Sequence, residues 1–141
     1  MKTKIIKIVT IAFIAIIVIS SCTKYPDGPK FSLLTKKARI TNNWKIEAVS
    51  FNGSDITSSY KFIAGDNYVL SITKDGKYSS TGNIGDDGTW KFGEDKDDAY
   101  FTSSKAGSSE QAYRILRLES KSMWFKHTES NGDVTIIKYK E

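Results

Sequence analysis

Apolar residues cluster at the start of the chain and alternate with polar residues over much of the remainder. Residues 8–19 form an almost unbroken apolar run, which follows Lys2, Lys4 and Lys7 and gives way at once to polar residues. A basic start, a short apolar run and small residues at its end are typical of a secretory signal peptide. An uncleaved membrane anchor is the weaker interpretation, because residues 5–19 are fewer than the roughly 20 that a membrane-spanning helix needs.

Beyond residue 40 the pattern predicts strands joined by turns. Asn52-Gly53 and Asn131-Gly132 are strong hairpin signals, and Lys74-Asp75-Gly76 is a third turn between alternating segments. Residues 60–63 could form a further short strand, and residues 54–59 are expected to be a loop. The eight clearer strands are predicted at residues 44–51, 68–73, 77–81, 88–92, 98–102, 112–119, 123–128 and 134–139.

A short helix is predicted within residues 31–40. Leu34 and Ala38 are four residues apart, and Ser32 is placed to cap the helix. No helix is expected after Ile40.

The predicted strands must form an antiparallel sheet, because the connections are too short to hold the crossover helices that parallel strands require. Strands at this spacing indicate a sandwich or a barrel. Successive hairpins without a long return connection favour an up-and-down barrel, whose closure removes exposed edges. The fold expected is therefore all-β, an eight-stranded antiparallel barrel with the short N-terminal helix closing one end.

Charge and cysteine content narrow the classes of function. The net charge of +5 includes Lys2, Lys4 and Lys7, so removing them lowers the 21 Lys and Arg to 18, against 16 Asp and Glu. This balance gives no electrostatic case for a nucleic-acid partner. A single cysteine, Cys22, excludes an internal disulfide.

Cys22 stands where the signal peptide would end. The segment Ile19-Ser20-Ser21-Cys22 resembles the lipobox of bacterial lipoproteins, in which the cysteine is lipidated and becomes the new N-terminus. The resemblance implies a signal peptide at residues 1–21, a lipidated cysteine and polar tether at residues 22–30, and one domain at residues 31–141. It places the protein in the cell envelope, held to a membrane by lipid. Thr23, the residue after the cysteine, favours attachment to the outer membrane. The sequence leaves open whether the domain faces the periplasm or the cell surface.

The domain resembles the lipocalin-like lipoproteins of Bacteroidetes. The resemblance rests on the order of the lipobox, the short helix, Asn42-Asn43-Trp44-Lys45, Asp75-Gly76-Lys77-Tyr78 and Gly88-Thr89-Trp90. Asn42 stands where lipocalins proper have a glycine, so the likeness is to the looser lipocalin-like group. It implies an eight-stranded barrel with a cup-shaped cavity, and binding of a small, apolar molecule.

Aromatic and aliphatic residues on the predicted strands are the candidates for lining such a cavity. Trp44 is expected to pack at the barrel end as a structural residue, as its counterpart does in lipocalins. The alternative for every cavity candidate is core filling, because the interior of an eight-stranded barrel is often filled by side chains. The apolar residues of the last three strands fall on both faces, so the pattern leaves open which set points inward. The candidate ligand-binding residues are Tyr68, Leu70, Ile72, Tyr78, Trp90 and Phe92.

Polar residues provide no catalytic or metal site by sequence. His127 is interpreted as a structural histidine near the surface, since Glu129 alone does not complete a set of metal ligands. The run Glu94-Asp95-Lys96-Asp97-Asp98 lacks the spacing of a calcium loop, since it contains Lys96 and no central glycine, and is interpreted as a solvated turn. Arg114 and Arg117 are expected on opposite faces of their strand, so that at most one could face the barrel interior.

Two hypotheses for function follow. The first is a membrane-anchored barrel that binds a small hydrophobic or amphipathic ligand. The alternative is a filled barrel that presents its loops at residues 52–59, 82–87 and 103–110 to another envelope protein, as a partner or inhibitor. An enzyme is not expected, and neither are cofactors or metals, because no nucleophile or paired-acid motif is recognisable.

Overall fold

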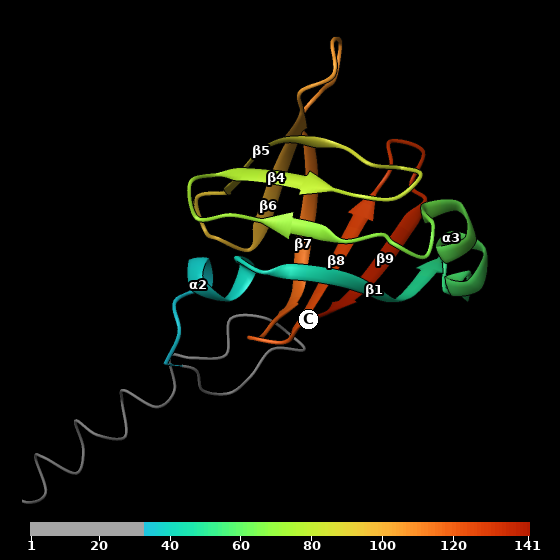
Figure 1. Cartoon of the computed structure of the whole chain (residues 1–141), viewed down its shortest axis with the longest axis horizontal. Helices are drawn as coiled ribbons and strands as arrows, with labels where there is room; N and C mark the ends of the chain where they lie inside the picture. Colours follow the sequence, from blue (N-terminus) through green and yellow to red (C-terminus); the bar gives the residue numbers. More distant parts are fainter. Residues whose placement is uncertain (1–32) are drawn as a thin grey trace, which may run out of the picture.

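The computed structural model describes residues 33–141, which form a closed β-barrel with two short helices (Figure 1). The signal peptide, Cys22 and the tether lie outside the described residues and stay predictions. The helices are α2 (Lys36–Ile40) and α3 (Thr57–Ala64). The strands are β1 (Asn43–Phe51), β2 (Ser54–Asp55), β3 (Leu70–Ile72), β4 (Lys77–Ser80), β5 (Asp87–Phe92), β6 (Asp98–Ser103), β7 (Gln111–Leu118), β8 (Ser122–Thr128) and β9 (Val134–Lys140).

The sheet closes because β1 pairs with both β3 and β9. Each strand from β3 to β9 pairs antiparallel with the next, and β1 pairs antiparallel with β9 from Lys45 to Phe51. The two residues of β2 extend the hairpin that follows β1. The predicted up-and-down barrel of eight antiparallel strands is therefore confirmed, with β2 as one addition.

Two β-bulges decide which residues face the core. In β7 the register shifts between Ile115 and Arg117, so Ile115 and Leu118 both face inward although they are three residues apart. A similar shift in β1, between Ile46 and Ala48, allows Ile46 and Val49 to be buried together. A bulge adds one residue to one strand, so every residue beyond it points to the opposite face from the one that strict alternation predicts. In the last three strands the inward set is Ile115, Leu118, Met123, Phe125, Ile137 and Tyr139.

The prediction that Arg114 and Arg117 lie on opposite faces is wrong for the same reason. Arg114 stands opposite Lys126 and Arg117 opposite Trp124, and these partners lie on one face of β8. Both arginines therefore face outward. Arg114 pairs with acidic side chains of the predicted acidic turn, and the Arg117 guanidinium lies 5.1 Å from the centre of the Trp124 ring.

Residues 57–64 form helix α3, so the predicted strand at residues 60–63 and the expectation of no helix after Ile40 are wrong. Ile56, Tyr60 and Ala64 are spaced by four residues and pack against the core, whereas Phe62 and Ile63 are exposed. Gly65 ends the helix with a φ of 89° and donates its backbone N–H to Lys61 O. A short, largely apolar segment such as residues 60–63, which includes Lys61, fits a strand or a helix equally well, and the spacing by four decides between them.

Helix α2 is shorter than predicted and begins after Thr35. Thr35 Oγ1 accepts a hydrogen bond from the backbone N–H of Ala38, whereas Ser32, the predicted cap, lies outside the described residues. Arg39 donates to Leu118 O at the end of β7, and Ile40 is fully buried. These contacts attach α2 to the barrel wall at the end of β7.

Candidate ligand cavity

A cavity of about 200 Å³ lies inside the barrel. Its walls come from strands β3, β4, β6, β7, β8 and β9, with Tyr60 of α3 and Ile84 of the β4–β5 connection. Ser80 and Asp86 add polar groups, and the remaining lining side chains are apolar or aromatic. These are Tyr68, Leu70, Tyr78, Phe101, Tyr113, Phe125, Ile137 and Tyr139.

A second hollow, of about 350 Å³, adjoins this cavity. The two share Tyr78, Asp86, Phe101 and Tyr113 among their lining residues. The β6–β7 loop supplies its outer wall, and Figure 1 shows this loop projecting from the barrel. The hollow is therefore the mouth of the cavity, lined by the loop residues Gly107, Ser108 and Ser109 with Ser103 and Gln111.

The β4–β5 connection is held against α3, which fixes Ile84 and Asp86 at the cavity. The backbone N–H of Asn83 donates to Ala64 O at 2.8 Å. At Gly82 a Cβ would lie 2.3 Å from the same carbonyl oxygen, and the φ of +85° also disfavours other residues. Glycine is therefore required where this connection crosses the end of α3.

Half of the predicted ligand-binding residues line the cavity and half do not. Tyr68, Leu70 and Tyr78 are in its lining. Ile72 and Trp90 are buried elsewhere in the core, and Phe92 packs against that core. Trp90 donates from Nε1 to Thr73 O and meets the Phe92 ring edge to face, with 5.2 Å between ring centres.

Trp44 is fully buried and lies beside α2. Its Nε1 donates to Ile40 O at 2.9 Å, which satisfies the indole N–H inside the core. Trp44 is absent from the lining of both hollows. Its contacts are those of a packing residue that joins β1 to the short helix.

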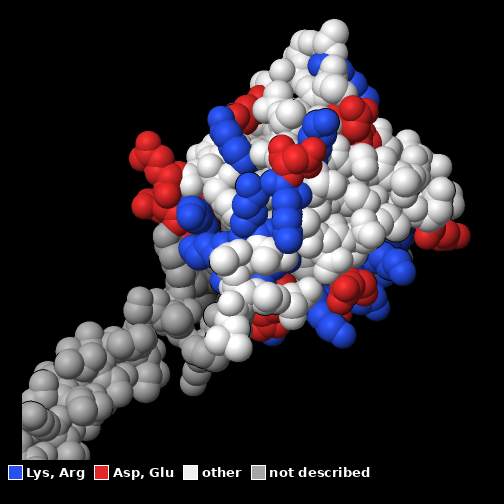
Figure 2. Space-filling view, turned by 60° about the vertical axis from the view of Figure 1, so that its left-hand side comes forward, with Lys and Arg blue, Asp and Glu red and all other residues white. Residues whose placement is uncertain are grey.

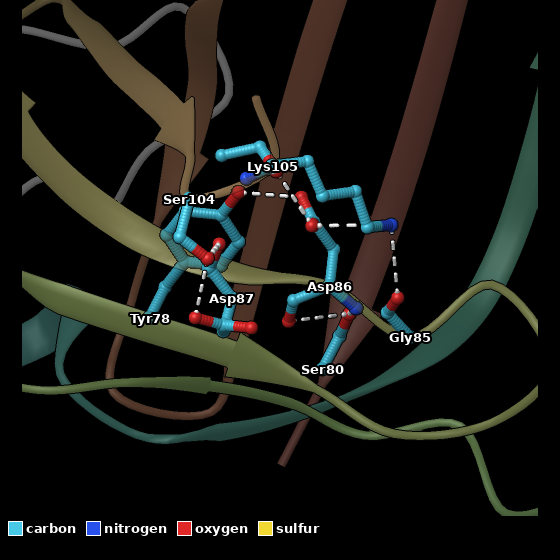
Figure 3. Close-up of polar contacts among 8 residues, drawn as sticks. Tyr78, Ser80, Gly85, Asp86, Asp87, Ser104 and Lys105 are labelled. Carbon is cyan, nitrogen blue, oxygen red and sulfur yellow. Dashed lines mark hydrogen bonds and ion pairs between the residues drawn. The ribbon is translucent and has the colours of Figure 1, made fainter. Parts of the chain in front are cut away.

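Asp86 gathers the polar contacts of the cavity (Figure 3). Its Oδ2 accepts from the Tyr78 hydroxyl and its Oδ1 from the Ser103 hydroxyl, both at 2.7 Å. Lys105 Nζ lies 3.3 Å from Oδ1. The backbone of Asp86 is fixed as well, because its N–H donates to Ser80 Oγ and its carbonyl accepts from Ser80 N. The carboxylate is thus held at the junction of the cavity and its mouth.

The hydrogen bonds at Asp86 favour its ionised form. Burial opposes ionisation, but donation from Tyr78, Ser103 and Lys105 outweighs it and lowers the pKa of the Asp86 carboxyl. Burial and the neighbouring carboxylate together raise the pKa of Tyr78. At neutral pH the cavity therefore contains a carboxylate beside a protonated phenol.

Five tyrosines line the cavity, and all five have a pKa raised above the ordinary value, so they are protonated at neutral pH. Burial raises the pKa of Tyr68 to about 12, partly offset by hydrogen bonds with Tyr139 and Ser80. Burial also raises the pKa of Tyr60, Tyr113 and Tyr139.

His127 lies at the barrel rim. Its Nδ1 is 2.9 Å from Ala112 O, its Nε2 is 3.3 Å from Glu129 Oε1, and its ring lies 5.0 Å from that of Tyr113. Within residues 33–141 there is no group of three His, Asp or Glu side chains that could hold a metal ion. The predicted acidic turn is occupied by ion pairs, with Asp97 facing Lys36 and Arg114.

Sequence reasoning missed Tyr60, Asp86, Tyr113 and Tyr139 as members of one site. Tyr113 and Tyr139 carried a usable signal, because both lie in strands with apolar neighbours. Tyr60 was missed because residues 60–63 were predicted as a strand and not as part of helix α3. Asp86 lay in a connection with no periodicity, where neither its inward direction nor its partners could be inferred.

No helix within the described part of the chain is both long and apolar enough to cross a membrane. Comparison of the sequence with models of known families and with curated proteins gives no match. The likeness to lipocalin-like lipoproteins therefore stays a prediction, beside a barrel fold and a cavity that the structure describes.

Proposed function

We propose that this chain is a lipid-anchored protein of the cell envelope whose lipocalin-like barrel binds a small amphipathic molecule. The observation that carries the binding part is the cavity itself, whose aromatic walls and mouth adjoin at Tyr78, Phe101 and Tyr113. Binding sites for small molecules are concave and mostly apolar, with a few placed polar groups. Asp86 and Ser80 supply such groups, and the aromatic rings supply the contact area.

Filling the edge of the cavity with a larger side chain tests the binding proposal. Every buried hydrophobic residue of the described chain lies between Ile40 and Tyr139, so residues 23–141 keep the whole core. We expect this protein to raise the fluorescence of phenylnaphthylamine, a neutral apolar dye, in a saturable titration. Ile84→Trp should weaken dye binding roughly tenfold, because Ile84 lines the cavity and is 37% exposed at its edge.

Ile63→Trp is the matched control, because Ile63 is an exposed isoleucine of α3 outside the cavity lining. It should leave dye affinity unchanged. Equal affinities of the two variants would contradict binding in this cavity. Absence of any dye binding would instead favour the alternative, a barrel that acts by presenting its loops to another envelope protein.

The anchoring part of the proposal rests on Ile19-Ser20-Ser21-Cys22 and the apolar run before it. Acyl chains contribute roughly 0.8 kcal/mol per buried CH₂, so a multiply acylated cysteine would hold the protein firmly to a membrane. We expect the full chain, expressed in a bacterium that processes lipoproteins, to partition into detergent. Its N-terminal peptide should begin at Cys22 and carry lipid.

Cys22→Ser should abolish both the lipid and the partitioning. Ser21→Ala keeps a small residue at the cut site and should retain them. Mass spectrometry of the N-terminal peptide gives the result directly. An unmodified Cys22 in membrane-bound protein would rule out the lipid anchor.

A further inference from the structure

The lining of the two hollows, as residues 33–141 form it, carries negative charge and no positive charge. Among the described residues that line them, Asp86 is the one charged side chain, and no Lys, Arg or His is in either lining. The outer surface differs, since acidic and basic side chains are interspersed over the face seen in Figure 2. A ligand whose charged group enters the cavity therefore meets one charged lining group, the Asp86 carboxylate, whose ion-pair partner Lys105 lies outside both linings.

Aromatic rings line the same two hollows as this carboxylate. Tyr78 and Phe101 meet edge to face at 5.2 Å, and Phe101 meets Tyr113 at 5.6 Å and Phe125 at 5.8 Å. Aromatic faces attract cations, best where water is excluded. The combination of a carboxylate with several ring faces suits an ammonium group and disfavours a carboxylate ligand such as a fatty acid.

Lys105 shows that an ammonium group fits beside Asp86. Its exposed side chain can also move away into solvent. Its ammonium lies 3.3 Å from Oδ1, but its side chain is 68% exposed. Exposed ion pairs contribute little to stability, so displacing Lys105 toward solvent costs little. An organic ammonium would replace it from the cavity side and gain contacts with the rings of Tyr78, Phe101 and Tyr113.

Resting on the proposed binding function, we propose that the ligand is an organic cation, an amine with an apolar or aromatic body. Its ammonium lies at Asp86 and its body lies in the barrel cavity. Tyr78 and Ser103 act as positioning residues, because their hydroxyls hold the two carboxylate oxygens at 2.7 Å each. They direct the carboxylate toward the junction of the cavity and its mouth.

Three probes of one shape test this inference on the unaltered protein. Phenethylammonium, phenethyl alcohol and hydrocinnamate differ mainly in charge, and their affinities can be measured by calorimetry on residues 23–141. We expect the cation to bind at least about tenfold more tightly than the alcohol, and the anion to bind least. An alcohol that binds as tightly as the cation would overturn the proposal, and so would binding by none of the three.

Variants locate the effect. Asp86→Asn should reduce the cation-to-alcohol ratio to about one, whereas Lys105→Gln should increase cation affinity by removing the competing ammonium. Asp87→Asn is the matched control, because the Asp87 side chain bonds Ser104 and lies outside both linings. A preference for the cation that survives in folded Asp86→Asn would place the site elsewhere. If Asp86→Asn does not fold, an unchanged cation affinity in Lys105→Gln would equally contradict a site at Asp86.

Failure here and failure of the proposed function are distinguishable. A protein that binds phenylnaphthylamine, and loses it in Ile84→Trp, still has a ligand cavity even if it shows no preference for cations.

Discussion

At the scale of single residues, the three tryptophans show how position decides role. Trp44 is fully buried with its N–H bonded to Ile40 O, and Trp90 is buried with its N–H bonded to Thr73 O. Trp124 lies on the outer face, where Lys138 Nζ is 4.0 Å from its ring centre. Two of these indoles therefore pack in the core, and the ring of the third makes a cation–π contact at the surface.

Trp44→Phe should lower the free energy of unfolding by about 1–3 kcal/mol, because it leaves a void and an unpaired carbonyl at Ile40. Trp124→Phe is the matched control and should cost less than about 1 kcal/mol, since it keeps an aromatic face for Lys138. Urea unfolding followed by circular dichroism measures both values. Equal losses for the two variants would contradict the assigned packing role of Trp44.

At the scale of elements, strand positions followed from alternation and turn chemistry, and most boundaries were predicted within two residues. The exceptions have physical causes. Helix α3 was missed because the four residues 60–63 are too few to show a helical period, and the spacing signal begins earlier, at Ile56. The inward face of β7 could not be predicted, because the bulge after Ile115 is set by pairing with β8, which lies outside any local window.

The cavity was predictable only where it is built from regular strands. Tyr68, Leu70 and Tyr78 follow the alternation of β3, β4 and the residues before β3, so they could be proposed from sequence. Asp86 depends on contacts with Ser103 and Lys105, which lie 17 and 19 positions further along the chain. Long-range pairing of loops has no local signature, so the polar part of the site became visible only in three dimensions.

At the scale of the whole molecule, the five tyrosines that line the cavity make the free energy of unfolding depend on pH in the alkaline range. The folded barrel raises the pKa of Tyr60, Tyr68, Tyr78, Tyr113 and Tyr139 above the ordinary value of 10.0. The unfolded chain therefore loses these protons first. The contribution to stability is complete below about pH 10 and is lost as the pH rises through the higher folded values.

We therefore expect the urea midpoint to fall between about pH 9 and about pH 11, with the tyrosinate absorbance of these five residues appearing together with unfolding. Tyr139→Phe should make this fall shallower, because Tyr139 is buried and its pKa is raised strongly. A constant midpoint over that range, or ionisation of these five tyrosines in the still-folded protein, would contradict the effect.

The pairing of β1 with β9 has a consequence for the order in which the chain can fold. Lys45 stands opposite Lys140, so the contact that closes the barrel joins residues at nearly opposite ends of the described chain. Such a contact has a high entropic cost of loop closure, and contacts of this kind slow folding. During synthesis, hairpins such as β3–β4 can form early, but β1 keeps an open edge until β9 has been made. The full sequence must therefore be available before the barrel, and the cavity inside it, can exist.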